Sequence, residues 1–228
     1  MGMPIASYSG MFGHSARLGT LDDAALIAGT EIATAMGWRR VEAISPGDKV
    51  LSFDHGMVPV REVIRHDPPE IGGQATPAAL RPIRVAAGLV DNSDAFEVLP
   101  GSHVMIESDL AETLMGDPFV LVPAEALTSR AGVERAPLTA PPARLVTLVF
   151  DEDEIVFLRS GAMQLCARGG DMLEEMFEQG HAGPTAILDL AEARDFFALM
   201  DDEASAESPA IHRVAPRRSQ RPPAWAIA

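Results

Sequence analysis

Cysteine and histidine, which often carry nucleophilic and proton-transfer chemistry, are scarce in this chain of 228 residues, with one cysteine and six histidines. A cysteine thiolate can attack a carbonyl carbon, and a histidine within hydrogen-bond reach can transfer the proton. Cys166 lies in an apolar segment where the pattern indicates helix, so we expect it to pack in the core. A single cysteine also excludes an intrachain disulfide and an all-cysteine metal site.

Histidine could instead bind a metal ion. A site built from His55, His66 and His103 is one hypothesis, but their spacing matches no metal-binding motif. His14 has no second candidate ligand nearby in the sequence, and His55 lies at the tip of an expected hairpin. The acidic residues of the 171–207 segment lack the compact spacing of a calcium-binding loop. We therefore expect no metal ion and no cofactor.

The elements that must position these residues are mainly short strands. Residues 29–53 organise the chain, because a Pro46-Gly47-Asp48 turn and Gly37 separate short apolar runs. A hairpin is expected between residues 50–53 and 58–64, around Asp54-His55-Gly56. Strands are also expected at residues 32–35, 82–85, 96–99, 103–106, 119–122, 145–150 and 154–158, the last two as a hairpin, with a helical turn at 123–127. This pattern predicts a mainly β domain over residues 25–160.

The pattern changes after the β domain. Apolar residues at helical spacing in 172–179 and 186–200 predict a short acidic α-helical extension over residues 161–207. Residues 208–228 contain four arginines, four prolines and no acidic residue, which indicates a disordered tail able to lie on the acidic helices or contact a partner. The glycine-rich residues 1–24 are expected to be a flexible lead-in.

Composition limits the classes of partner. The 33 acidic and 18 basic residues give a net charge of −15, which argues against nucleic acid and anionic membranes as partners. No apolar run approaches the roughly 18 residues of a membrane-spanning helix, and the first residues lack a secretory-signal pattern. These patterns predict a cytoplasmic protein, with signal-less export left open.

Five blocks of the β domain, taken in order, resemble the bacterial Hint (Hedgehog/intein-like) domain family. The opening block comprises Gly29-Thr30, Ile32, Thr34, Gly37, Val41-Glu42, Pro46-Gly47-Asp48 and Val50-Leu51. The later blocks are Pro82-Ile83-Arg84-Val85, residues 98–106 around His103, residues 120–127, and Phe150-Asp151 with residues 154–157. The resemblance covers about residues 25–160 and implies an all-β, horseshoe-like fold with pseudo-twofold halves.

The resemblance also implies a chemistry that this chain lacks in part. Active members attack the carbonyl before their first residue, a Cys or Ser, and so exchange an amide for an ester. A Thr or Ser three residues before a histidine helps to protonate the scissile amide. The family spacing places the first residue on Ala25 and the histidine on His103, with Pro100 three residues before it. A further histidine of the closing block falls on Thr147 or Asp153. Because a methyl group cannot form an ester, only His103 remains as a catalytic candidate.

Two interpretations follow from this resemblance. The first is a Hint-like domain without self-splicing or self-cleavage, which acts as a structural or protein-interaction module through residues 161–228. The alternative is an autoprocessing endopeptidase in which Thr30, Ser15 or Cys166 replaces the usual nucleophile and works with His103.

Overall fold

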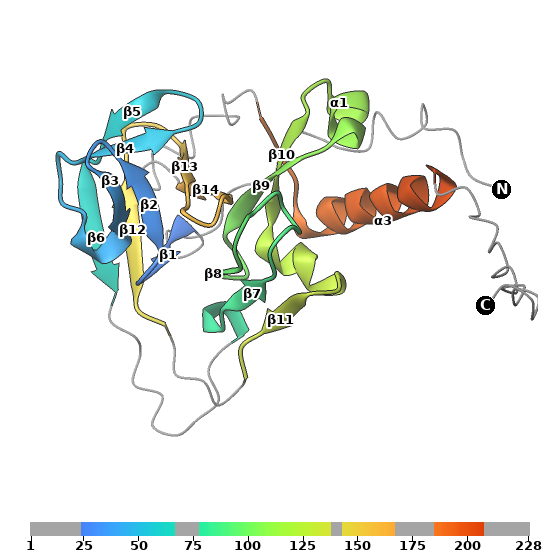
Figure 1. Cartoon of the computed structure of the whole chain (residues 1–228), viewed down its shortest axis with the longest axis horizontal. Coiled ribbons are helices and arrows are strands. Elements are labelled where there is room, and N and C mark those ends of the chain that lie inside the picture. The colour runs from blue at the N-terminus through green and yellow to red at the C-terminus, as the bar shows by residue number, and fades with distance from the viewer. Residues whose placement is uncertain (1–23, 67–77, 138–142, 167–184, 208–228) are drawn as a thin grey trace, which may run out of the picture.

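The computed structural model describes residues 24–66, 78–137, 143–166 and 185–207, whose strands form three sheets (Figure 1). The strands are β1 (Leu26–Ile27), β2 (Glu31–Thr34), β3 (Gly37–Arg40), β4 (Lys49–Ser52), β5 (Gly56–Pro59), β6 (Glu62–His66), β7 (Ile83–Val85), β8 (Phe96–Val98), β9 (His103–Glu107), β10 (Phe119–Pro123), β11 (Val133–Arg135), β12 (Leu145–Val149), β13 (Glu154–Phe157), β14 (Met163–Cys166) and β15 (Ala186–Ile187). The α-helices are α1 (Asp109–Met115) and α3 (Leu190–Glu207), and short 3₁₀ helices span Val41–Ala43, Ala78–Leu80 and Ala124–Ser129.

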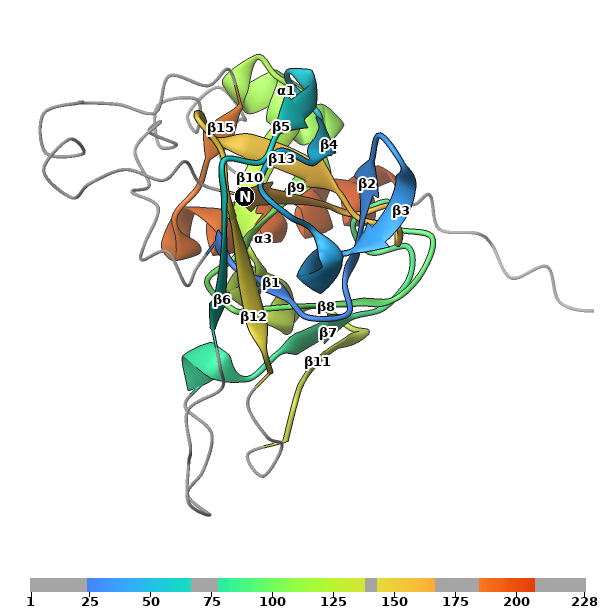
Figure 2. The ribbon, with the colours of Figure 1, turned by 90° about the vertical axis from the view of Figure 1, so that its left-hand side faces the viewer.

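The largest sheet has nine strands in the order β15-β10-β9-β14-β13-β4-β2-β3, with β5 paired to β4. The two smaller sheets are β1-β12-β6 and β11-β7-β8 (Figure 2). One apolar cluster joins all three sheets and α3, because it contains Ile32, Val85, Val146 and Phe196. The architecture confirms the predicted fold class, a mainly β fold with a short C-terminal helix.

Local hydrogen bonds explain why residues 29–53 form the predicted strand-turn-strand pattern. The Thr34 hydroxyl donates to the Gly37 carbonyl at 2.7 Å and accepts from the Met36 N–H at 3.1 Å. Gly37 has a φ of +92°, which a residue with a side chain rarely adopts, so glycine closes the β2-β3 hairpin. The Asp48 carboxylate accepts from the Ser45 N–H and from Arg39, each at 2.9 Å, and so fixes the approach to β4.

Two of the predicted hairpins differ from the observed pairing. The β4-β5 hairpin forms as predicted around residues 54–56, but the expected second strand is broken after Pro59 into β5 and β6, which belong to different sheets. The hairpin predicted between residues 145–150 and 154–158 is wrong, because β12 pairs with β1 and β6 whereas β13 pairs with β14 and β4. All five residues of β12 are buried, so neighbours distant in sequence take both of its edges.

Cys166 lies in a strand and not in the helical context expected from the sequence. β14 pairs with β13 on one side and with β9 on the other, near the middle of the large sheet. Both faces of β14 are buried, because Gln164, Leu165 and Cys166 all lie in the interior. The segment therefore lacks the alternation of polar and apolar residues that marks a half-buried strand. The domain boundary at residue 160 remains a prediction, although this strand of the sheet lies beyond it.

The C-terminal helix is predicted correctly in type but begins later than residue 186. Ala186 and Ile187 form β15, a parallel neighbour of β10. The Asp189 carboxylate then accepts from the N–H groups of Ala191 and Glu192, each at 2.8 Å, and so caps the first turn of α3. α3 packs against β10 and the 3₁₀ helix Ala124–Ser129, so it is part of the core.

Helix α1 is an element that the sequence patterns missed. The Ser108 hydroxyl accepts from the Leu110 N–H at its start, and Gly116, at a φ of +81°, ends it. Strand β11 was also missed, because residues 128–142 carry three prolines and were expected to form a loop. The lead-in, the helix at residues 172–179 and the tail at 208–228 lie outside the described residues. Within the described part, no helix is long and apolar enough to cross a membrane.

Candidate functional site

Ala25, the predicted nucleophile position, is 1% exposed and lies immediately before β1. Its carbonyl oxygen accepts a hydrogen bond from Gln164 Nε2 at 3.1 Å and a longer one from Ser102 Oγ at 3.4 Å. Both donors are buried, with 2% of Gln164 and none of Ser102 exposed. The predicted nucleophile position therefore carries a methyl group, and two buried side chains donate hydrogen bonds to its carbonyl oxygen.

The sheet fixes these two donors. Gln164 lies in β14 directly opposite Val104 of β9, so the backbone ladder sets the direction of its side chain. Ser102 lies in the turn before β9, where its N–H donates to the Leu99 carbonyl at 3.2 Å and its carbonyl accepts from Ala124 at 2.8 Å. These two hydrogen bonds thus connect the start of the β domain to β14 and to the turn before β9, near the middle of the large sheet.

His103, the predicted catalytic residue, begins β9 opposite Pro123 and is 7% exposed. Burial lowers the pKa of its imidazole to about 4, so the ring is uncharged at neutral pH. General acid–base catalysis works best when the catalytic pKa is close to the operating pH, a condition that His103 does not meet. Among the described residues, the side-chain hydrogen bonds to Ala25 come from Ser102 and Gln164, and none comes from His103.

The proposed substitute nucleophiles are placed differently by the fold. Cys166 is fully buried, and burial together with the nearby Glu154 carboxylate raises the pKa of its thiol to about 12. Thr30 is partly exposed in the turn before β2, where its carbonyl accepts from the Val41 N–H at 2.8 Å. Ser15 lies outside the described residues. No hydrogen bond in the described part of the chain joins Thr30 or Cys166 to His103.

The Cys166 thiol is expected to be unreactive in the folded protein. At pH 8 a pKa of about 12 leaves on the order of one thiolate in 10⁴, and burial also blocks access. Less than about 5% labelling by a disulfide reagent is expected over one hour, followed by complete labelling after denaturation in guanidinium. The only cysteine of the chain makes the count unambiguous. Rapid labelling of the native protein would show that this part of the large sheet opens readily.

A buried polar cluster that the sequence did not reveal surrounds Glu154. The Ser52 hydroxyl donates to the Glu154 carboxylate, and His55 Nδ1 lies 3.1 Å from the same carboxylate oxygen. His55 Nε2 also lies 3.6 Å from Glu152. Glu154 and Ser52 are buried, whereas the His55 side chain is 48% exposed. The acidic residue on an inward position of β13 is the one signal that could have indicated this cluster.

The hydrogen bond to Glu154 and its negative charge raise the pKa of His55 above 6.5, with smaller contributions from Glu152 and Asp54. The stabilisation by His55 is therefore complete below the unfolded pKa of about 6.5 and is lost as pH rises through the folded pKa. Replacing His55 by alanine is expected to lower stability more at pH 6 than at pH 9, as measured by urea unfolding. Glu152→Gln should change this pH dependence only slightly, since Glu152 makes a minor contribution. Equal losses at both pH values for His55→Ala would contradict the role of the charged imidazole.

The histidines are not assembled into a metal site. His55 contacts the Glu154 carboxylate, and His66 Nε2 lies 3.0 Å from the Thr147 hydroxyl. Across the described ranges, no three histidine, cysteine or acidic side chains come together as potential metal ligands. The hypothesis of a site formed by His55, His66 and His103 is therefore not supported by their placement.

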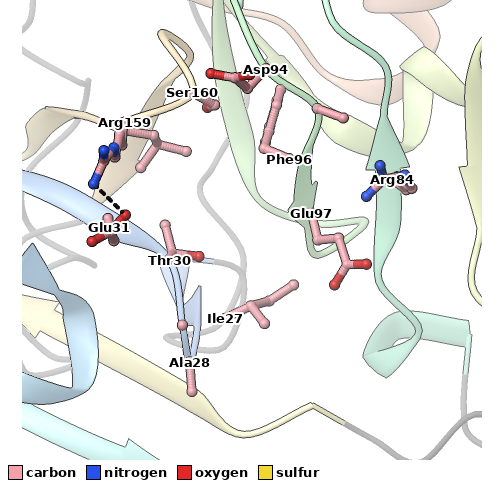
Figure 3. Close-up of a pocket in the computed structure, with 13 residues that line it drawn as sticks. Ile27, Ala28, Thr30, Glu31, Arg84, Asp94, Phe96, Glu97, Arg159 and Ser160 are labelled. Atoms are coloured by element: carbon pink, nitrogen blue, oxygen red, sulfur yellow. Dashed lines mark hydrogen bonds and ion pairs between the residues drawn. The ribbon is translucent and has the colours of Figure 1, made fainter.

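An open groove of about 350 Å³ adjoins the turn that contains Thr30. Figure 3 shows residues from the turn before β2, from β7 and β8, and from the loop after β13 around it. Arg159 pairs with Glu31 at 3.1 Å on one side, whereas Arg84 and Glu97 lie on the opposite side (Figure 3). None of the lining residues is a histidine or a cysteine, so the groove contributes no nucleophile–imidazole pair.

The comparison with models of protein families identifies one family. The model of the Hint domain family matches residues 24–163. Among solved structures, the chain is similar to the bacterial intein-like domain from Clostridium thermocellum, with 20% identity, a TM-score of 0.40, and coverage of 63% of this chain and 98% of that chain. It is also similar to the MchDnaB-1 intein, with 12% identity, a TM-score of 0.36, and coverage of 61% and 98%. No curated protein matches the chain.

Proposed function

The chain belongs to the Hint domain family, and we propose that it is a member that neither splices nor cleaves itself and that serves as a structural or protein-interaction module. The observation that carries this proposal is the alanine at the nucleophile position. An acyl shift needs a thiol or hydroxyl to attack the preceding carbonyl, and the Ala25 methyl group supplies neither.

The surroundings of Ala25 support the same proposal. Ser102 and Gln164 donate to the carbonyl of Ala25, whereas the family reaction would take place at the carbonyl of the residue before it. Pro100 replaces the hydroxyl residue expected three positions before His103, and the uncharged imidazole of His103 is a poor proton donor at neutral pH. The polar groups near the former reaction centre therefore act as structural hydrogen-bond donors.

The mass of the purified full chain over several days, with and without an added thiol, tests the proposal. We expect one unchanged species. A discrete cleavage at or near Ala25 would contradict the absence of self-processing and favour the autoprocessing alternative. In that case, Thr30→Val and Cys166→Ala variants separate the two described candidate nucleophiles, because each replaces a hydroxyl or thiol by a group that cannot form an ester.

The proposed module contacts another protein through residues 161–228. Its acidic helical part and basic, proline-rich tail carry opposite charges, which suits a polar contact surface. The β domain buries most of its apolar side chains internally, and this leaves the extension as a candidate contact region.

Deleting residues 208–228 is expected to leave the melting temperature unchanged within about 2 °C, because the removed residues carry few apolar groups. Binding to a partner should weaken at the same time, as measured by titration calorimetry. Truncation after residue 222 is a matched control, since it keeps all four arginines of the tail. A large fall in melting temperature on full deletion would show that the tail is part of the folded core.

A further inference from the structure

The three large hydrophobic residues that are most exposed in the described part of the chain gather on one end of the large sheet. Met36 is 83% exposed, and Trp38 and Met57 are each 46% exposed. Met36 lies in the β2-β3 turn, Trp38 in β3 and Met57 in β5. Single exposed apolar residues are common, but a group on one face marks an interaction surface.

The strand register places two of these residues in one continuous row. Trp38 lies opposite Ala33, and Leu51 lies opposite Met57. Because Thr34 lies opposite Val50, the antiparallel ladder also brings Ala33 beside Leu51. The row Trp38-Ala33-Leu51-Met57 thus crosses β3, β2, β4 and β5 on the face opposite the one that buries Ile32 and Val50.

The row ends at a free sheet edge. Among the strands of the described residues, β3 is the last in the sheet order and pairs with β2 alone. Its outer N–H and C=O groups are available to an added strand, which is a common mode of peptide recognition. Figure 1 shows β3 at the opposite end of the molecule from α3, so this surface is separate from the C-terminal extension.

Two basic side chains flank the row on the same face. Arg40 is two residues from Trp38, and Lys49 is two residues from Leu51, so each shares the outward direction of its neighbour. Neither forms an ion pair with a described residue, whereas the adjacent Arg39 pairs with Asp48 at 2.9 Å. Glu31 lies opposite Arg40 in the β2-β3 ladder, but its carboxylate pairs with Arg159 at 3.1 Å.

We propose that the outer edge of β3, with Trp38 and Arg40 on its exposed face, binds an extended acidic segment of a partner protein that adds to β3 as a strand. The proposal rests on the proposed role as an interaction module and adds a second contact, separate from residues 161–228. An apolar residue of the segment packs on Trp38, and an acidic residue two positions away pairs with Arg40. Pairing of two copies through β3 with Trp38 opposite Arg40 would instead place the two Arg39 residues opposite each other, which repulsion disfavours.

A defined peptide probe tests this surface on the full-length chain. The peptide is acetylated and amidated and has the sequence Thr-Ile-Thr-Glu-Thr-Ser. A Trp225→Phe variant leaves Trp38 as the single tryptophan, whose emission reports contact with the peptide. We expect a saturable change in emission, and at least about tenfold weaker binding when Glu in the peptide is replaced by Lys. Replacing the Thr between Ile and Glu by Pro should also weaken binding, because a proline cannot donate to the ladder.

Arg40→Glu and Arg84→Glu are matched reversals of exposed arginines on different sheets. Arg40→Glu should weaken binding of the acidic peptide at least about tenfold and improve binding of the Lys peptide, whereas Arg84→Glu should change neither. Unchanged melting temperatures show that both variants fold.

Equal binding of the Glu and Lys peptides, or no binding at millimolar concentration, overturns the proposal. A dimer in sedimentation that Arg40→Glu alters overturns it as well, in favour of a second copy as the occupant. Self-cleavage of the chain would overturn the proposed absence of processing, whereas it would leave the peptide titration on intact protein interpretable.

Discussion

Replacing Phe196 by alanine is expected to lower the free energy of unfolding by about 3–5 kcal/mol, the usual cost of truncating a buried phenylalanine. The Phe196 side chain is fully buried, and its ring centroid lies 6.0 Å from that of Phe197. It belongs to the same apolar cluster as residues of all three sheets, so its loss leaves a cavity beneath α3. Urea unfolding of the full chain measures the change.

The neighbouring Arg194 supplies the matched control. Its side chain is exposed on the same helix, so Arg194→Ala should change stability by no more than about 0.5 kcal/mol. A loss below about 1 kcal/mol for Phe196→Ala would show that α3 is an appendage that can detach from the β core.

Replacing Gln164 by glutamate is expected to cost about 3–5 kcal/mol at pH 8, because it places a carboxylate without a counter-charge in a buried site. Gln164 Nε2 donates to the Ala25 carbonyl oxygen at 3.1 Å, and a carboxylate there has no proton to donate. A charged carboxylate oxygen would then lie beside the partially negative carbonyl oxygen of Ala25, near the middle of the large sheet.

The pH dependence of this variant separates the cost of burying a charge from the cost of losing the hydrogen bond. Burial should raise the pKa of the introduced glutamic acid, so its destabilising effect is small below the unfolded pKa of about 4.3 and grows as pH rises through the folded pKa. In the protonated state, the acid O–H can donate to Ala25. Gln164→Leu removes the donor without adding a charge, and it should cost about 1–3 kcal/mol with little dependence on pH. Equal losses of stability for Gln164→Glu and Gln164→Leu at pH 8 would contradict a close contact between this side chain and the Ala25 carbonyl oxygen.

Much of the fold could be predicted from local patterns. Glycine and proline mark the turns between β2, β3 and β4, and alternating burial in these strands follows the predicted periodicity. Residues 145–150 and 154–158 show the limit of such patterns. Each is a strand as predicted, but an apolar strand can pair with several others of similar composition, so proximity in sequence did not identify the partners.

The site was predictable only in part, because burial and long-range contacts determine its chemistry. His103 and Cys166 were identified as the candidate imidazole and thiol, but only the fold shows that burial lowers one pKa to about 4 and raises the other to about 12. Glu154 meets His55 across 99 positions of sequence, a contact that no local spacing indicates.

Residue identity alone predicts that this chain lacks the nucleophile of its family, since the methyl side chain at Ala25 does not depend on folding. It also determined the turns, because the backbone preferences of glycine and proline are local. The contacts of Ala25 follow only from the fold, because the donors to its carbonyl oxygen come from β14, 139 positions away, and from the turn before β9. Such contacts depend on the pairing of distant strands, which local propensity does not specify.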